Sequence, residues 1–328
     1  MHWFDILQEA CADIKVLTLP LTYAELVSQA ARQKQKDQNK YTPEEVMRWE
    51  EVVKEWDAAT AMLPQIKGNA IIKTIDGEVV LYKLDNALKD GWEDPELGAK
   101  FVSHLTDSLE TLRKAWKGSL PLPGTYDTRH HALEEMRTTY GSDHVGVWHF
   151  AFWCSTGMPH LGPHVSTQCL GQKNVWRFQP ATRFLEAMAP WQQAAAMLFR
   201  LLEPTSCKRY KDNFDNLARK YTSMHTIRKT PRMTFLGLAI PFQVRVLPHK
   251  DNADDKQGWV AMTNLGDFQD GDLVVGSDET AFRFEYQPGH FVLMKSALLR
   301  HGVMPFEGTR RALVLFSHEN VFTYGSQA

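Results

Sequence analysis

The sequence contains little cysteine, with four residues among 328 and no Cys-x-x-Cys pair. Such scattered cysteines argue against a disulfide-stapled secreted domain and favour a reducing, intracellular compartment. Long apolar runs are lacking as well, so we expect no membrane-spanning helix and no membrane partner. The first residues carry no basic segment of the kind that opens a secretory signal. We therefore expect a soluble protein of the cytoplasm or nucleus.

An excess of charge of either sign is also lacking, because 37 basic and 39 acidic residues give a net charge of −2. A general attraction to nucleic acid or to an anionic membrane is therefore not built into the chain. Eight lysines and arginines do gather between residues 207 and 232, against two aspartates. We interpret this segment as a solvated face, and a contact with ligand phosphates stays open as the alternative.

The overall composition, 43% hydrophobic and 23% charged, is that of a globular protein. Residues 1–63 read mainly as helices, and Asp76-Gly77 between two β-rich runs predicts a hairpin. The Pro- and Gly-rich stretch from Leu120 to Gly124 is the best candidate boundary. We predict a mainly helical N-terminal cap with a β-hairpin over residues 1–120, and a catalytic body over 121–328.

The last hundred residues alternate short β-like runs with turns rich in Gly, Asp and Pro. Many short strands that close on one another predict a sandwich or a jelly-roll barrel, here with flanking helices, and thus an α+β fold. The mouth of such a barrel can hold a site whose residues come from different strands.

Three potential metal ligands lie in this region, namely His249, Asp251 and His301. His249 and Asp251 are two apart at the end of an apolar run, so on a strand both would project to the same side. Two imidazoles and one carboxylate on one face of a metal leave the opposite positions open, as in non-haem Fe(II) oxygenases. A single His is more often structural than a ligand, but the ordered set is a stronger signal.

Arg310 follows on a strand-like run, and a guanidinium fork suits the distal carboxylate of a dicarboxylic co-substrate. Its neighbour Arg311 competes for the role. If Arg310 and Ala312 point inward with Val314 and Phe316, strand alternation turns Arg311 outward. We therefore assign the co-substrate role to Arg310.

Taken together, these residues resemble the Fe(II)/2-oxoglutarate-dependent dioxygenases, and more narrowly the fungal branch related to the TET/JBP base oxidases. The narrower likeness lies in His249-Lys250-Asp251-Asn252 and in the run from Gly258 to Phe268, and it extends over residues 240–322. The resemblance implies a double-stranded β-helix core that binds Fe(II), 2-oxoglutarate and O2. In that family a Ser more often stands two residues after the arginine, where this chain has Ala312.

The resemblance further implies oxidation of a C–H bond, coupled to decarboxylation of 2-oxoglutarate to succinate and CO2. We expect a small organic molecule as the substrate. TET/JBP-like oxidation of a methylated base in nucleic acid is the first alternative, and a non-catalytic barrel acting as a binding module is the second. The complete ligand set argues against the binding module, because a degenerate copy would usually have lost one of the four residues. The oligomeric state is not predicted.

Two other constellations compete with this interpretation. Cys154, His160, His164 and Cys169 have the composition of a zinc site, but their spacing is irregular, so we interpret them as packing or loop residues. His160 or His164 remains a candidate for lining the substrate pocket. A serine hydrolase is disfavoured because no Gly-x-Ser-x-Gly elbow occurs.

Overall fold

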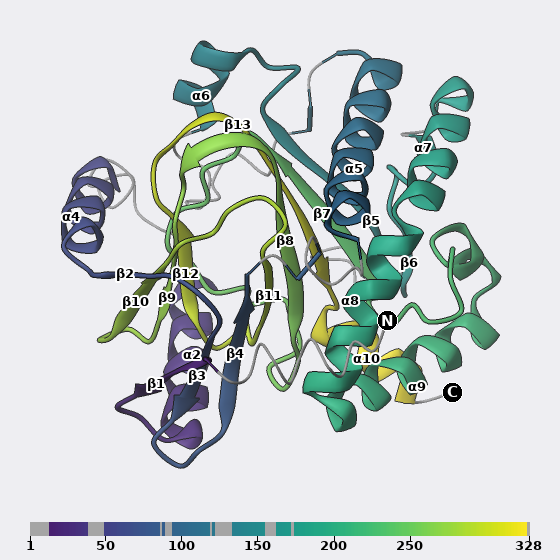
Figure 1. The fold of residues 1–328 in the computed structure, drawn as a ribbon. Helices are drawn as coiled ribbons and strands as arrows, with labels where there is room; N and C mark the ends of the chain where they lie inside the picture. The colour runs from purple at the N-terminus through teal and green to yellow at the C-terminus, as the bar shows by residue number, and fades with distance from the viewer. Residues whose placement is uncertain are drawn as a thin grey trace.

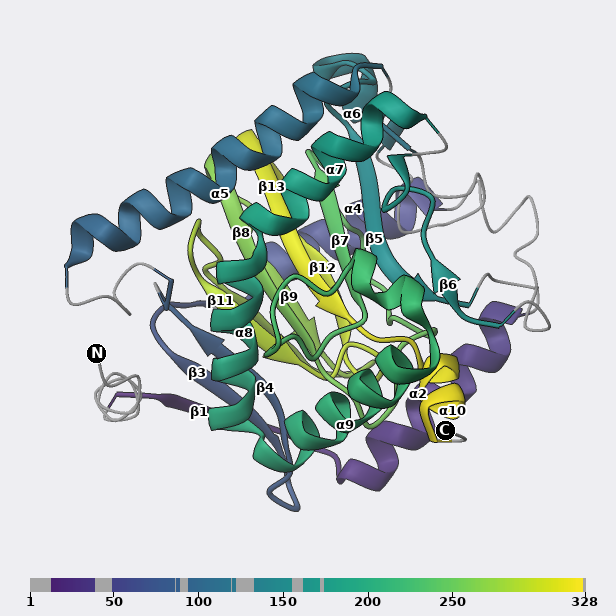
Figure 2. The ribbon, with the colours of Figure 1, turned by 90° about the vertical axis from the view of Figure 1, so that its right-hand side faces the viewer.

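The computed structural model describes residues 13–38, 49–85, 87–88, 94–118, 120–121, 133–154, 162–171 and 174–326. Two β-sheets pack against each other, and helices cover the outer side of the larger one (Figures 1 and 2). No helix among these residues is long and apolar enough to cross a membrane.

The larger sheet has nine strands and the smaller has four. The order in the larger sheet is β1 (Lys15–Leu19), β3 (Ala70–Thr74), β4 (Val79–Leu84), β11 (Phe291–Met294), β8 (Val260–Asp270), β13 (Phe306–Phe316), β7 (Gly237–Phe242), β5 (Gly146–Trp153) and β6 (His164–Val165). The order in the smaller sheet is β12 (Arg300–Val303), β9 (Leu273–Gly276), β10 (Ala281–Phe284) and β2 (Gln65–Ile66).

The C-terminal strands alternate between the sheets in the manner of a double-stranded β-helix. From β7 in the larger sheet the chain passes to the segment around His249, which bridges His301 of β12 in the smaller sheet. It returns for β8, crosses for β9 and β10, returns for β11, crosses for β12 and ends in β13. The predicted α+β fold with a jelly-roll core is therefore confirmed.

Strand alternation divides the core into two clusters, one on each side of the larger sheet. On β13, Leu313 and Leu315 belong to the cluster beneath the helices, whereas Val314 and Phe316 belong to the cluster between the sheets. This is the period-two pattern expected of a sheet that is buried on both faces.

The helices on the outer face follow from local sequence signals. Asp94 caps the first of them, since its carboxylate accepts a hydrogen bond from the Glu96 N–H at 2.9 Å and Pro95 occupies the first turn. The outer layer consists of α5 (Pro95–Trp116), α7 (Val175–Ala187), α8 (Ala189–Leu202) and α9 (Pro204–Lys220). The remaining helices are α2 (Tyr23–Gln38), α4 (Trp49–Ala61), α6 (Leu133–Tyr140), the 3-10 helix η4 (Thr222–Thr226) and α10 (Glu319–Ser326).

The N-terminal part is built partly as predicted. The hairpin around Asp76-Gly77 forms between β3 and β4, and Gly77 has the positive φ of 89° that favours glycine. Helix does predominate among the described residues of 1–63, in α2 and α4, but the strand β1 was not predicted and pairs in parallel with β3 at the sheet edge. The division after residue 120 stays a prediction, and residues 122–124 of the expected boundary lie outside the described residues.

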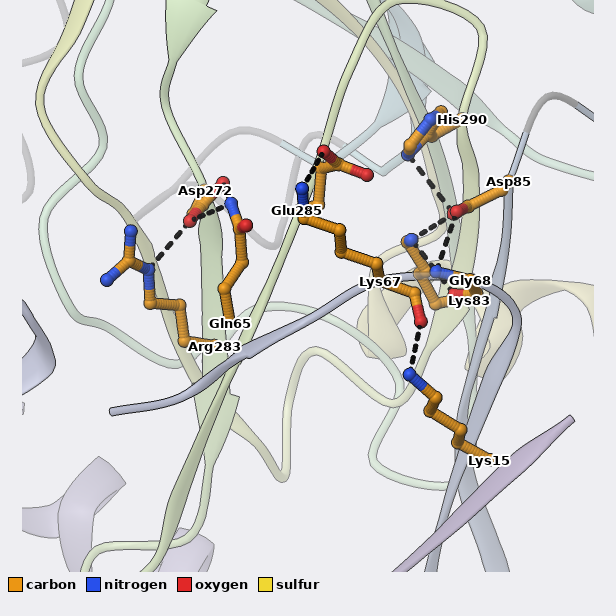
Figure 3. Close-up of polar contacts among 10 residues, drawn as sticks. All are labelled: Lys15, Gln65, Lys67, Gly68, Lys83, Asp85, Asp272, Arg283, Glu285 and His290. Carbon is orange, nitrogen blue, oxygen red and sulfur yellow. Dashed lines mark hydrogen bonds and ion pairs between the residues drawn. The ribbon is translucent and has the colours of Figure 1, made fainter. Parts of the chain in front are cut away.

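Polar contacts connect the β3–β4 hairpin to the barrel (Figure 3). Asp85, just after β4, accepts a hydrogen bond from the Gly68 N–H at 2.9 Å and pairs with the buried Lys83. Its Oδ1 also lies 3.3 Å from Nδ1 of His290, in the turn before β11. The hairpin is thus continuous with the barrel sheet and contacts the turn before β11.

Candidate metal centre and co-substrate site

Backbone pairing brings His249 and His301 together. Each donates its N–H to the other's carbonyl oxygen at 2.9 Å, and their rings lie 4.2 Å apart between centroids. Gly302 permits this approach, because a Cβ there would come within 2.9 Å of the Pro248 backbone.

Asp251 completes the triad that the sequence predicted. Its backbone N–H donates to the Ser296 carbonyl at 3.1 Å, which turns the carboxylate toward both histidines. Oδ1 lies 3.3 Å from Nε2 of His249, and Oδ2 lies 3.5 Å from Nε2 of His301. One ligand atom from each residue falls within 4.8 Å of the others, and no other such group occurs among the described residues.

The tautomers of the two histidines follow from their other ring nitrogens. Nδ1 of His249 lies 2.8 Å from the Leu247 carbonyl, and Nδ1 of His301 lies 3.0 Å from the Leu299 carbonyl. A carbonyl oxygen can only accept, so each Nδ1 carries the proton and each Nε2 keeps a lone pair for a metal. This donor set fits a divalent transition metal such as Fe(II).

The electrostatics keep the carboxylate ionised. Burial alone would raise the pKa of Asp251, but the adjacent His249 and His301 rings, in their protonated form without a metal, hold that pKa well below its ordinary value. The site therefore presents an anionic oxygen beside two imidazole nitrogens.

The residues beside the ligands are linked to one another. Lys250 is buried and its Nζ lies 3.0 Å from Oδ1 of Asp278, which also lies 3.5 Å from Nε of Arg300. Asp278 thereby connects the residue between His249 and Asp251 to the residue before His301. The Arg300 side chain faces this carboxylate.

Arg310 and Arg311 point to opposite faces of the sheet, as strand alternation predicted. Arg311 pairs with Glu110 of α5 on the outer face. The Arg310 side chain lies between the sheets, where its Nη2 donates to Oδ1 of Asn264 at 2.8 Å. The same amide donates from Nδ2 to the Tyr286 carbonyl at 2.9 Å, which fixes its orientation.

No carboxylate of the described residues neutralises Arg310. The residue is 3% exposed, its Nε has no hydrogen-bond partner, and the rings of Phe268 and Phe306 lie 5.7 and 5.5 Å from its guanidinium. Burial lowers the pKa of Arg310 to about 10, so the group is still protonated at neutral pH. A buried cation without an acid partner is suited to pairing with a ligand carboxylate.

Gln243 holds the backbone of Arg310 on both sides. Its N–H donates to the Arg310 carbonyl at 2.9 Å, and its Oε1 accepts from the Arg310 N–H at 2.8 Å. Its Nε2 also donates to the Gly308 carbonyl. Gln243 adopts a φ of +52°, which is uncommon for any residue other than glycine, asparagine or aspartate. Neither Gln243 nor Asn264 was assigned a role from the sequence, although Asn264 lies in the Gly258–Phe268 run.

The inner faces of β5, β7 and β13 are partly open, unlike their outer faces. His149, Trp153, Ala239 and Val314 keep part of their surface accessible, although neighbouring outward residues of the same strands are buried. The Trp153 ring stacks on the His318 ring at 5.8 Å.

This open region adjoins the triad. His318 forms a bridge with Asp254, and the Asp254 N–H donates to the Asp251 carbonyl at 3.0 Å. His149 lies in the same group, with its ring 5.4 Å from that of Trp153. The inner faces thus offer flat ring surfaces next to the candidate metal centre.

A separate cavity of about 300 Å³ lies on the outer side of the sheet, where Phe242, Gln243, Thr309 and Arg311 contribute to its lining. Since Arg311 points outward and Arg310 inward, β13 separates this cavity from Arg310. It therefore differs from the space beside the triad.

The alternative zinc set is not assembled among the described residues. Cys154 and Cys169 are buried, and burial raises the pKa of the Cys169 thiol to about 11, which disfavours the thiolate that zinc requires. His164 lies on β6 with Nδ1 3.2 Å from the Gly162 carbonyl. His160 lies outside the described residues.

Four of the eight basic residues in segment 207–232 pair with acids. Lys208 pairs with Asp212, while Lys211 and Arg228 both pair with Asp215. Arg209 pairs in the same way with Asp255. These pairs support the interpretation as a solvated face over a contact with phosphates.

Comparison with known proteins supports the fold. No family model matches the chain, and no curated protein does. Among solved structures, the chain is similar to NgTET1 in complex with 5mC DNA, with 18% identity over 79% of this chain and 80% of that one, at a TM-score of 0.51. The two share a fold. The chain also matches OsALKBH1, with 13% identity over 72% of this chain and 97% of that one, at a TM-score of 0.35. It matches JOX2 in complex with 2OG, Fe and JA, with 12% identity over 73% of this chain and 67% of that one, also at a TM-score of 0.35. Scores this low do not establish a shared fold.

Proposed function

We propose that this protein is a non-haem Fe(II)- and 2-oxoglutarate-dependent dioxygenase that oxidises a C–H bond of a small organic substrate. The observation that carries the proposal is the combination of the His249, Asp251 and His301 triad with the buried, unneutralised Arg310 in one barrel. A fold alone does not decide an activity, so these residues bear the argument.

The triad would hold Fe(II) through Nε2 of both histidines and one carboxylate oxygen of Asp251. Fe(II) bound there supplies O2 activation coupled to decarboxylation of 2-oxoglutarate to succinate and CO2. Arg310 binds the distal carboxylate of 2-oxoglutarate and so orients its 2-oxo acid end toward the triad. The barrel wall around Arg310 excludes water, which strengthens this ion pair.

The half-open inner faces of β5, β7 and β13 receive the substrate. The stacked Trp153 and His318 rings, with His149 beside them, favour a planar group in the substrate. Pairs with three aspartates take up four of the eight basic residues in segment 207–232, which reduces the positive charge available to a phosphate backbone and favours a small molecule.

The test is an anaerobic titration with Fe(II) and 2-oxoglutarate, monitored for the weak visible metal-to-ligand charge-transfer band. We expect a band that requires both additions and that weakens in Arg310→Ala. If no band forms under strictly reducing conditions, the cofactor assignment is wrong.

Oxidation of a methylated base in nucleic acid is the second candidate. It is favoured by the fold shared with NgTET1, which was solved with 5mC DNA. Oligonucleotide binding that weakens steeply with salt would support this candidate, because contacts to the phosphate backbone release counterions. Binding that is absent or insensitive to salt would support the small molecule.

A further inference from the structure

A carboxylate of the smaller sheet contacts both chain segments that carry the candidate metal ligands. It belongs to Asp278, in the turn between β9 and β10. The Ser277 N–H donates to the Thr280 carbonyl at 2.8 Å, and the Ser277 Oγ accepts from the N–H groups of Glu279 and Thr280 at 3.2 and 3.0 Å. Gly276 permits this turn, since a Cβ there would come within 1.9 Å of the Thr280 carbonyl oxygen. The backbone that carries Asp278 is therefore fixed by its own hydrogen bonds.

One oxygen of this carboxylate meets a cation from each ligand segment. Oδ1 of Asp278 lies 3.0 Å from Nζ of Lys250 and 3.5 Å from Nε of Arg300. Lys250 is the residue between the first two candidate ligands, and Arg300 immediately precedes the third. No other carboxylate of the described residues forms an ion pair with either cation. Asp278 alone therefore compensates the charges that adjoin the triad in the sequence.

The positive charge of this group exceeds its negative charge. Burial lowers the pKa of Lys250, Asp278 acts in the opposite direction, and the charges of Arg300 and of Arg32 on α2 lower that pKa further. Three cations thus interact with a single carboxylate. The Lys250 side chain is 1% exposed whereas that of Arg300 is 40% exposed, so water screens the ammonium far less than the guanidinium.

A divalent ion in the triad would add positive charge beside this group. Neutral imidazoles carry no charge, so the Asp251 carboxylate offsets only one of the two charges of the ion. Consecutive Cα atoms lie about 3.8 Å apart, and Lys250 and Arg300 are direct chain neighbours of the ligands. Like charges in a partly buried region repel at such separations. The affinity of the triad for an ion should therefore depend on whether the two cations are compensated.

We propose that Asp278 sets the affinity of the triad for a divalent metal ion by neutralising Lys250 and Arg300 beside the ligands. This inference rests on the part of the proposed function in which the triad holds Fe(II), and it is independent of the substrate and of 2-oxoglutarate. Asp278 is a positioning residue that acts through these two cations. The turn between β9 and β10 is then part of the metal centre, although it contributes none of the proposed ligands.

The test is Asp278→Asn in the full chain, with the Fe(II) affinity measured anaerobically by competition with a chelator, without 2-oxoglutarate. Asparagine keeps the size of the side chain but not its charge, so we expect the affinity for Fe(II) to weaken by about 10-fold at low salt. Added salt should reduce this loss, because it screens the exposed Arg300. The loss is thus a measure of charge, with no turnover involved.

Asp272→Asn is the matched control on the same sheet. Asp272 immediately precedes β9, whereas Asp278 follows it, and its Oδ2 pairs with Nε of Arg283 on β10 at 2.7 Å. Arg283 is not a chain neighbour of a candidate ligand. The control should therefore lower the melting temperature, because a buried pair is broken, and leave the Fe(II) affinity close to that of wild type.

A second substitution separates the role of charge from a structural role. Adding Lys250→Met to Asp278→Asn removes the uncompensated buried cation, so most of the lost Fe(II) affinity should return. A contact that only held the two segments together would not be restored, because the double variant lacks it as well. If Asp278→Asn does not fold, Arg300→Gln takes its place as the test. It leaves Asp278 with one cation fewer, and the Fe(II) affinity should rise about threefold above wild type.

Failure of this inference and failure of the proposed function give different results. If wild type binds Fe(II) and Asp278→Asn binds it as tightly, the inference is wrong and the proposed function stands. The same holds if the double variant stays as weak as Asp278→Asn, if Asp272→Asn loses as much affinity, or if Arg300→Gln binds no more tightly than wild type. If wild type does not bind Fe(II), or binds it equally well after Asp251→Ala, the proposed function itself falls.

Discussion

The guanidinium of Arg310 and the side-chain amide of Asn264 meet inside the barrel, with Nη2 donating to Oδ1 at 2.8 Å. The amide is a neutral dipole, so it satisfies one donor and leaves the positive charge uncompensated. The contact therefore orients Arg310 but uses only one of its guanidinium donors, and a dicarboxylate can accept from the others.

Arg310→Met should separate stability from ligand binding. The substitution removes a buried charge that has no acid partner, so the unfolding free energy without 2-oxoglutarate should stay level or rise. In wild type, 2-oxoglutarate at 100 times its Kd should add about 2.7 kcal/mol, and this gain should vanish in the variant. Denaturant unfolding with and without 2-oxoglutarate measures both effects. A variant that keeps the gain would contradict the role of Arg310.

Arg311→Met is expected to behave in the opposite way. Arg311 joins β13 to α5 through Oε1 of Glu110, and its removal leaves that oxygen of the partly buried carboxylate without its partner, while Oε2 keeps its bond to Arg113. We expect a loss of about 1–3 kcal/mol in unfolding free energy and an unchanged affinity for 2-oxoglutarate. Urea unfolding and calorimetry on the same sample test this pair of outcomes. A large fall in affinity would mean that the two arginines are not separated by the sheet.

Metal binding should weaken in acid through the imidazoles. The pKa of Asp251 is already held well below its ordinary value, so its carboxylate stays ionised as the pH falls. His249 and His301 bind a metal only as neutral imidazoles, so acid should weaken the affinity, by up to about 100-fold per pH unit where two protons compete with one ion. Competition with a chelator between pH 5 and 8 measures the slope. A flat profile would argue against two histidine ligands.

Two substitutions of Gln243 should differ in stability because of the backbone conformation at this position. Gln243→Ala and Gln243→Gly both remove the side-chain bonds to Arg310 and Gly308, but only glycine adopts a φ of +52° without cost. The glycine variant should therefore be more stable than the alanine variant by about 1 kcal/mol. Both should bind 2-oxoglutarate less tightly than wild type, which calorimetry would detect. Equal stabilities would indicate that the loop relaxes in the variants.

The residues that the sequence predicted are those whose position follows from short-range rules. Period-two alternation places Arg310 inward and Arg311 outward, and the two-residue spacing of His249 and Asp251 puts them on one side. The Asp76-Gly77 turn is equally local. Each depends on only a few neighbouring residues.

The residues that were missed depend on contacts that are distant in the sequence. Gln243 and Asn264 acquire their roles only when β7 and β8 come to lie around Arg310. Strand β1 was missed because it is a short edge strand whose burial and pairing come from β3, about 55 residues further on. Nothing in the local composition of these segments signals such partners.

The reciprocal hydrogen bonds between His249 and His301 have a consequence for how the metal is handled. The separation of the two imidazoles is set by a backbone pairing that forms with the sheet, and their Nδ1 atoms are fastened to carbonyls of their own chain. Little conformational entropy is then left for an ion to remove when it binds. The site is formed before an ion binds, so we expect a chelator to remove the ion, and a fresh ion to bind again, without refolding of the protein.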